Sequence, residues 1–255
     1  MVTIDLQGKY ILTTGGLGSI AEFVTHRLLE AGAILLITDI LPQEEPEAKL
    51  RSWNLSSNTW RYFPMDVTDE ASVSSSTRSI LDRFPATDCV ISLSGGCALH
   101  PFSKTDVREY DRIFDYNYHG HVRIARTITD IWTLLQTKGH MIFTSSLVGS
   151  LPWVDLAAYA PAKAALEMLA KCLALEFADQ GIRFNCIAPG HVATGSSLKV
   201  YEQDDEDRRR GDSAMPLRRL VRPDSIADAY LWLSSPLAQD VNVQAIKIDC
   251  GASLP

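Results

Sequence analysis

The chain has 255 residues, of which 46% are hydrophobic and 22% charged, and its formal net charge is −7. These values are ordinary for a soluble globular protein, and the acidic balance excludes the basic footprint of a nucleic-acid-binding domain. The length fits one large α/β domain over residues 1–255, with two small domains as the alternative.

Strand-like and helix-like segments alternate along the whole chain. Residues 9–14 form a short apolar, β-branched run, and after a glycine turn apolar residues recur at helical spacing up to Gly32. Residues 33–40 are a continuous apolar run, as expected for a strand that is buried on both faces of a parallel sheet. Further strands are predicted within 60–69 (ending at Asp66), 88–96, 139–146, 182–190 and 244–251, and helices over 71–84, roughly 106–136, 159–179 and 224–235.

This alternation predicts a doubly wound, mainly parallel sheet with right-handed crossovers, which is the Rossmann type of α/β fold, in a single domain. Residues 195–215 are the least patterned stretch, because they mix Gly, Ser and opposed charges. We expect an irregular loop near 191–216 that covers a substrate.

The composition also bears on location and partners. Five cysteines form no C-x-x-C pair, their number is odd, and the first residues lack a secretory h-region, so we expect reduced thiols in the cytoplasm. No segment approaches the length of a membrane span, and the six histidines show no metal-ligating spacing. We therefore expect neither a metal site nor a membrane or nucleic-acid partner.

The segment TTGGLG, residues 13–18, lies between the first predicted strand and its helix. Glycines in this place allow a tight turn and let backbone N–H groups approach a pyrophosphate at the helix N-terminus. Asp39 ends the next strand, where its carboxylate can bind the adenosine ribose and repel a 2′-phosphate. No Lys or Arg stands in the turn or in the four residues after Asp39, which favours NAD over NADP. The alternatives are a helix cap at the glycines and a turn residue at Asp39.

Ser146 ends the fifth predicted strand, thirteen residues before Tyr159, and Lys163 follows Tyr159 by four. Tyr159 and Lys163 share a helix face, and Pro161 is tolerated if the helix begins near Tyr159. A phenol pKa of about 10 is too high for proton exchange near neutrality, and we expect the Lys163 ammonium and an oxidised nicotinamide to lower it. Tyr159 would then exchange a proton with a substrate oxygen that Ser146 holds. The alternatives are an exposed helix pair and a strand-end serine.

The order of these motifs resembles the short-chain dehydrogenase/reductase family over nearly the whole chain. The matching segments are the turn from Thr14 onward, "DVTD" at 66–69, "APGHVAT" at 188–194 and "IKIDCG" at 246–251. Asn117 matches the helix asparagine of the family, and Ser146, Tyr159 and Lys163 match its catalytic set. The resemblance implies that Lys163 also binds the nicotinamide ribose and that Asn117 joins Lys163 through water in a proton relay.

The resemblance also implies an NAD cofactor, with NADP as the alternative, and a homotetramer or homodimer that pairs long helices and final strands. The residues implied to contact the cofactor are Gly15, Gly18, Ser19, Ile20, Asp39, Asp66, Val67, Ser94, Gly95, Tyr159, Lys163, Pro189, Gly190, Val192 and Thr194. Ser146, Tyr159 and Trp153 are the candidates for substrate contact.

Three segments depart from the family pattern. Ser19 and Ala21 stand where T-G-x-x-x-G-x-G has glycines, and the stretch also fits the T-G-x-x-G-x-x-A pattern of a longer, epimerase-like branch. The family's Asn-Asn-Ala-Gly is Ser-Leu-Ser-Gly at 92–95. Cys250 stands in the middle of the terminal Asp-Gly-Gly.

We expect an oxidoreductase that transfers a hydride between NAD(H) and a secondary alcohol or ketone of a small organic molecule, such as a sugar acid, polyol or hydroxy acid. One alternative keeps the fold but uses NADP or performs epimerisation, and another is a non-catalytic dinucleotide-sensing module. Further candidates for the substrate pocket are Leu151, His100 and Phe102, and loop packing is the alternative for these and for Trp153. His191 could approach the substrate or the cofactor, and the alternative is an exposed loop histidine.

Overall fold

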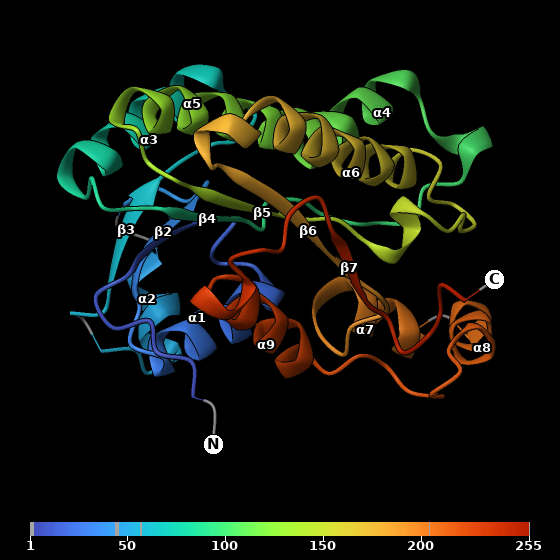
Figure 1. The fold of residues 1–255 in the computed structure, drawn as a ribbon. Coiled ribbons are helices and arrows are strands. Elements are labelled where there is room, and N and C mark those ends of the chain that lie inside the picture. Colours follow the sequence, from blue (N-terminus) through green and yellow to red (C-terminus); the bar gives the residue numbers. More distant parts are fainter. Residues whose placement is uncertain (1–2, 44–45, 57, 204, 255) are drawn as a thin grey trace.

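The apolar runs of the sequence pair into one seven-stranded sheet in the computed structural model, which describes residues 3–43, 46–56, 58–203 and 205–254 (Figure 1). All neighbouring strands are parallel, in the order β3-β2-β1-β4-β5-β6-β7. The strands are β1 (Tyr10–Thr14), β2 (Ile34–Asp39), β3 (Trp60–Pro64), β4 (Cys89–Ser92), β5 (His140–Thr144), β6 (Arg183–Pro189) and β7 (Ala245–Ile248). The strand order reverses between β1 and β4, so the predicted doubly wound Rossmann fold is confirmed, and a ligand crevice is expected there.

Helices cover both faces of this sheet (Figure 1). Along β2, Leu35 and Ile37 pack into the core beneath α1 and α9, whereas Leu36 packs into the core on the opposite face. Because both faces are covered, the central strands β1, β2, β4, β5 and β6 are buried at nearly every position instead of alternating. One face carries α1 (Ser19–Glu30), α2 (Pro46–Ser52) and α9 (Pro223–Leu233), and the other carries α3 (Glu70–Arg83), α4 (Val107–Phe114), α5 (Gly120–Leu135) and α6 (Tyr159–Glu176).

Three helical segments differ from the sequence-based expectation. The stretch 106–136 is not one helix, because a π-helical turn over Asp115–His119 separates α4 from α5. The short helix α2 was not predicted. The prediction that the segment near 191–216 is an irregular loop is wrong, since most of this segment forms α7 (Gly195–Gln203) and α8 (Asp205–Ala214). Most described side chains of α8 are exposed, so it has no apolar stripe by which a sequence pattern could reveal it.

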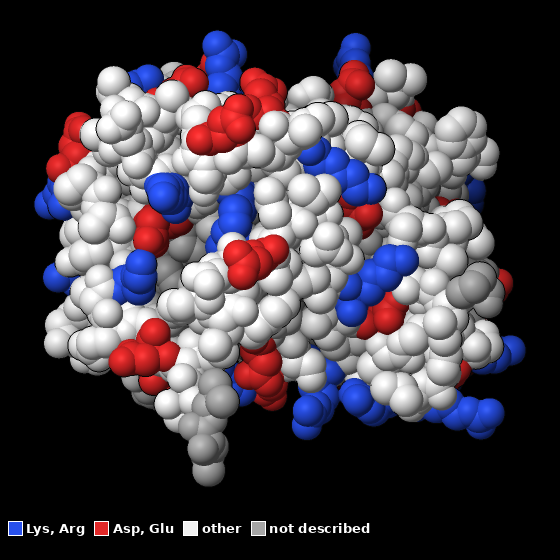
Figure 2. Space-filling model, in the orientation of Figure 1, with Lys and Arg blue, Asp and Glu red and all other residues white. Residues whose placement is uncertain are grey.

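Charged residues of both signs are scattered in small groups over the face of the molecule that Figure 2 shows. This distribution agrees with a formal net charge of only −7 on 255 residues. Within the described ranges, no helix combines the length and the apolar character that crossing a bilayer requires.

Candidate active site

In the turn after β1, the backbone of Gly15 lies very close to the backbone of the loop after β4. Gly15 has a φ of +63°, and a Cβ atom there would lie 2.6 Å from the Cα of Ser94, so only glycine fits. The Gly16 N–H donates to the carbonyl of Thr38 at 2.9 Å, which ties the turn to β2. Gly18 is the N-cap of α1 and offers no side-chain cap to the first turn of the helix. The N–H groups at this helix start therefore suit a phosphate, as the sequence predicts.

Asp39 lies beside this turn, at the carboxyl end of β2. Its Oδ2 accepts a hydrogen bond from the Leu17 N–H at 3.0 Å, and its Oδ1 accepts one from the Ile40 N–H at 2.8 Å. A cation that sequence reasoning missed is also there: Lys49, from α2, donates from Nζ to the Leu17 carbonyl at 2.6 Å. Ten positions separate Lys49 from Asp39, so a search of the residues just after Asp39 could not find it.

The loop after β4 brings three candidate residues together. Gly95 has a φ of +143°, and a Cβ atom there would lie 2.6 Å from Asn117 Oδ1 and 3.4 Å from Lys163 Nζ. Asn117 is fully buried in the π-helical turn. Its Nδ2 donates to the carbonyls of Gly96 at 3.0 Å and Ile113 at 3.1 Å, and its Oδ1 accepts from the Gly96 N–H at 3.2 Å. Ser94 is also buried and donates from Oγ to Thr14 Oγ1 at 2.8 Å.

Ser146 and Tyr159 meet at the carboxyl edge of β5. Ser146 caps a short 3-10 turn, where its Oγ accepts from the Val148 N–H at 3.4 Å. Tyr159 is the first residue of α6, as Pro161 in the first turn requires, and its side chain lines the same pocket as that of Ser146. Lys163 Nζ lies 5.5 Å from the centre of the Tyr159 ring. The predicted trio is therefore brought together in space.

The sequence-based expectation of a lowered Tyr159 pKa combined Lys163 with a bound oxidised nicotinamide, and it stays a prediction. In the protein by itself, burial raises the pKa of the phenol, and its interaction with Ser146 offsets only part of this rise. Burial also lowers the pKa of Lys163 to about 8. Both shifts have one cause, because a low-dielectric surrounding disfavours the charged form of either group. In the protein by itself, desolvation is therefore the main influence on the pKa of Tyr159.

The other predicted cofactor residues lie at the same carboxyl edge. Asp66 Oδ1 accepts from the Thr68 N–H at 2.9 Å, and Val67 packs against Gly120. Past β6, a Cβ atom on Gly190 would lie 2.7 Å from the Cα of Asp249, and Val192 pairs with Val221. Thr194 then leads to Gly195, which packs against Ser19 at the start of α1, while the neighbouring Ile20 is half-buried against the core. The segment 190–195 therefore connects β6 to the glycine turn.

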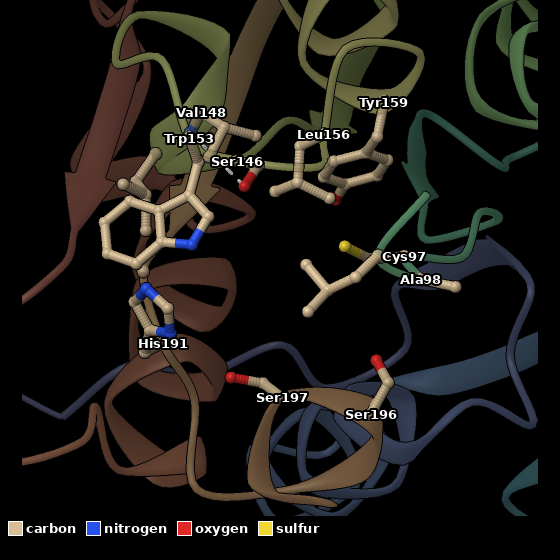
Figure 3. Close-up of a pocket in the computed structure, with 13 residues that line it drawn as sticks. Cys97, Ala98, Ser146, Val148, Trp153, Leu156, Tyr159, His191, Ser196 and Ser197 are labelled. Atoms are coloured by element: carbon tan, nitrogen blue, oxygen red, sulfur yellow. Dashed lines mark hydrogen bonds between the residues drawn. The ribbon is translucent and has the colours of Figure 1, made fainter. Parts of the chain in front are cut away.

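A pocket opens beside Ser146 and Tyr159 (Figure 3). Trp153, a predicted substrate contact, lies on the pocket wall with His191, and their ring centres are 4.9 Å apart. Phe102 and His100, the two pocket candidates that follow β4 in the sequence, do not line this pocket. Phe102 packs edge-on against Tyr110, and His100 faces Glu109. Lining residues that sequence reasoning missed include Cys97, Ala98, Val148, Leu156, Ser196 and Ser197.

These missed residues carry no motif that could have revealed them, because they come from the segment after β4, the segment between β5 and α6, and the first turn of α7. Within the part of the chain that the structure describes, no group of three His, Cys, Asp or Glu side chains is placed to hold a metal ion.

Comparisons with known proteins agree with this geometry. The family model described as Enoyl-(Acyl carrier protein) reductase matches residues 15–253. The chain is 29% identical over 256 residues to 2,3-dihydro-2,3-dihydroxybenzoate dehydrogenase of Bacillus subtilis, which covers 98% of this chain and 97% of that protein. It is 30% identical over 260 residues to Oxidoreductase UcpA of Escherichia coli O157:H7, which covers 98% and 96%. The solved structure of gox2181 superposes with a TM-score of 0.89 at 23% identity, over 98% and 97% of the two chains, and shares the fold.

Proposed function

The chain belongs to the short-chain dehydrogenase/reductase family, and on this premise we propose that it transfers a hydride between NAD(H) and a secondary alcohol or ketone, with Tyr159 as general acid/base. The family is one of NAD(P)-dependent oxidoreductases that act on CH–OH groups, and named relatives of this chain are dehydrogenases. The observation that carries the proposal is that Ser146 and Tyr159 line one pocket, with Lys163 buried beside the Tyr159 ring. We treat residues 1–255 as one dinucleotide-binding and catalytic domain.

The chain's own groups account for the proton. A bound nicotinamide ring donates or accepts the hydride. Tyr159 holds its proton near neutrality because burial raises its pKa, so in reduction it donates this proton from Oη to the carbonyl oxygen. In oxidation the alcohol proton would pass to the phenolate form of Tyr159, which must first lose its own proton. Ser146 donates a hydrogen bond from Oγ to the same oxygen. The Lys163 ammonium, 5.5 Å from the ring centre, stabilises the phenolate that remains after donation.

The residues at the carboxyl edge fit a dinucleotide. Gly15 and Gly18 leave room for the pyrophosphate at the start of α1, where Gly18 offers no side-chain cap, and we assign the Asp39 carboxylate, beside the Leu17 N–H, to the adenosine ribose. We assign NAD as the preferred cofactor because the Asp39 carboxylate would repel a 2′-phosphate. NADP is the second candidate, and Lys49 Nζ at the Leu17 carbonyl is the observation that favours it. By family resemblance, Asn117 joins Lys163 in a proton relay.

Absorbance of NADH during oxidation of a panel of secondary alcohols tests the assignment. The Tyr159→Phe variant should keep the fold and cofactor binding and should lose several orders of magnitude in turnover, since a general acid/base contributes about 10²–10⁴-fold. Tyr10→Phe is the matched control, because Tyr10 begins β1 at the opposite edge of the sheet and its loss should leave turnover unchanged. A near-normal rate in Tyr159→Phe would remove this residue from the mechanism. Tight NADH binding without turnover of any compound would support the dinucleotide sensor instead.

We further propose a cytoplasmic homotetramer or homodimer that assembles through the long helices and the final strand. Met168 and Leu175 on α6 are 56% and 82% exposed, and β7 is the last strand of the sheet, so both offer surface for a second copy. Sedimentation that shows a stable monomer at micromolar concentration would contradict this assembly.

A further inference from the structure

The wall of the pocket beside Tyr159 has an uneven distribution of polar groups. Near the reacting pair it is apolar, with Val148, Leu156 and Ala98 among its residues. Polar side chains other than Ser146 and Tyr159 lie across the cavity (Figure 3), where His191 follows β6 and Ser196 and Ser197 belong to the first turn of α7. Among the described residues that line the pocket, none is Asp, Glu, Lys or Arg.

We propose, on the basis of the function assigned above, that the substrate is an uncharged, compact alicyclic secondary alcohol or its ketone, with a second neutral polar group at the end remote from the reacting carbon. A carboxylate or phosphate held here would lose part of its hydration, and among the described lining residues it would find the His191 imidazole but no guanidinium or ammonium. An ammonium substrate would likewise find no carboxylate. A sugar acid or hydroxy acid is therefore disfavoured, and the neutral members of the expected range remain.

The size and shape of the cavity point to a single ring. Its volume is about 120 Å³, and an engineered apolar cavity of roughly 150 Å³ holds one benzene molecule. The Trp153 and His191 rings, tilted by 57° with centres 4.9 Å apart, present flat surface to such a body. The hydroxyls of Ser196 and Ser197 can then hydrogen-bond a neutral hydroxyl, carbonyl or amide at its far end.

The first turn of α7 does not change this conclusion about charge. A helix start has a partial positive charge, but Gly195 packs this turn against Ser19 at the glycine turn. The start of α7 therefore adjoins the place where a dinucleotide pyrophosphate is expected, and an anion there belongs to the cofactor.

Matched substrate pairs test the proposal. 4-Hydroxycyclohexanecarboxamide and 4-hydroxycyclohexanecarboxylate share the ring and the secondary alcohol and differ in charge. With NAD as oxidant, we expect kcat/KM for the amide to exceed that for the acid by at least about tenfold, which corresponds to 1.36 kcal/mol of transition-state free energy. Equal or better turnover of the acid would overturn the inference and leave the proposed function intact. Absence of turnover with every pair, in enzyme that binds NADH, would overturn the proposed function and with it the inference.

A gain of charge at the far wall gives an independent readout. Ser197→Lys introduces an ammonium where the remote group should lie, so the amide-to-acid ratio should fall by at least about tenfold. Ser75→Lys adds the same charge at an exposed position of α3 and should leave the ratio unchanged. A ratio that does not move in a folded, NADH-binding Ser197→Lys variant would show that Ser197 does not face the substrate, and would overturn the assignment of this wall.

Discussion

Lys163 donates a hydrogen bond from its ammonium to the backbone carbonyl of Thr144, at 2.9 Å. This bond ties α6 to the carboxyl end of β5, the strand that leads into Ser146. The bond also gives the ammonium of this lysine, which is 2% exposed, a hydrogen-bond acceptor in place of water. Burial still disfavours its charge and lowers its pKa to about 8, and this shift makes stability depend on pH.

Replacing Lys163 by Met should remove a rise of stability with pH. Between pH 8 and about 10.4, the unfolded chain carries the lysine proton and the folded chain does not. The unfolded state then binds more protons, so the free energy of unfolding rises with pH, by up to about 1.4 kcal/mol per pH unit. Urea unfolding at pH 7.5, 8.5 and 9.5 should show a difference between wild type and Lys163→Met that grows with pH. Parallel curves would mean that Lys163 keeps an ordinary pKa in the folded protein.

Adjacent glycines offer a matched pair of substitutions. Gly95→Ala places a Cβ atom 2.6 Å from Asn117 Oδ1 at a φ of +143°, and this strain should lower the free energy of unfolding by about 1–3 kcal/mol and reduce turnover. Gly96→Ala meets its nearest neighbour, Tyr116 Cε2, at an ordinary 3.6 Å, so its stability should be unchanged or higher by up to ~1 kcal/mol. Thermal and urea unfolding of both variants, with NADH titration, check the contrast. Equal behaviour of the two would show that Gly95 is not constrained.

Asp39→Ala should weaken NAD binding and relax discrimination against NADP. The carboxylate accepts from the Leu17 and Ile40 N–H groups and is placed to bind the ribose and to repel a 2′-phosphate. Loss of one charge-assisted hydrogen bond corresponds to roughly a tenfold rise in the dissociation constant of NAD. Paired titrations with NADH and NADPH measure both effects. A fall in affinity of equal size for the two cofactors would argue against a discriminating role.

Lys49→Ala should affect the two cofactors in the opposite sense. The ammonium at the Leu17 carbonyl would attract a 2′-phosphate, so its removal should weaken NADPH binding more than NADH binding, and more at low ionic strength. Lys9→Ala is the control, since Lys9 pairs with Asp88 before β1 begins. NADPH affinity that is insensitive to Lys49→Ala would leave NAD as the sole candidate.

The sequence predicted the sheet because its strands are long apolar runs separated by helical patterns, and this signal is local. The same locality made Gly15, Asp39 and Ser146 candidates, because Gly15 directly follows a predicted strand and the other two lie at the ends of predicted strands. Local patterns failed where an element has little apolar surface. The exposed helix α8 and the short α2 were missed, and so was Lys49, which α2 carries.

The sequence by itself determined the strand–helix order and the spacing of Ser146, Tyr159 and Lys163, because hydrophobic periodicity and helix geometry operate within a few residues. Only the tertiary structure decided how deeply Tyr159 and Lys163 are buried and what character the pocket has. Desolvation, which raises the pKa of Tyr159 and lowers that of Lys163, depends on atoms contributed by the whole fold. The uncharged wall likewise joins residues from loops and a helix that lie far apart in the chain, and no spacing rule connects them.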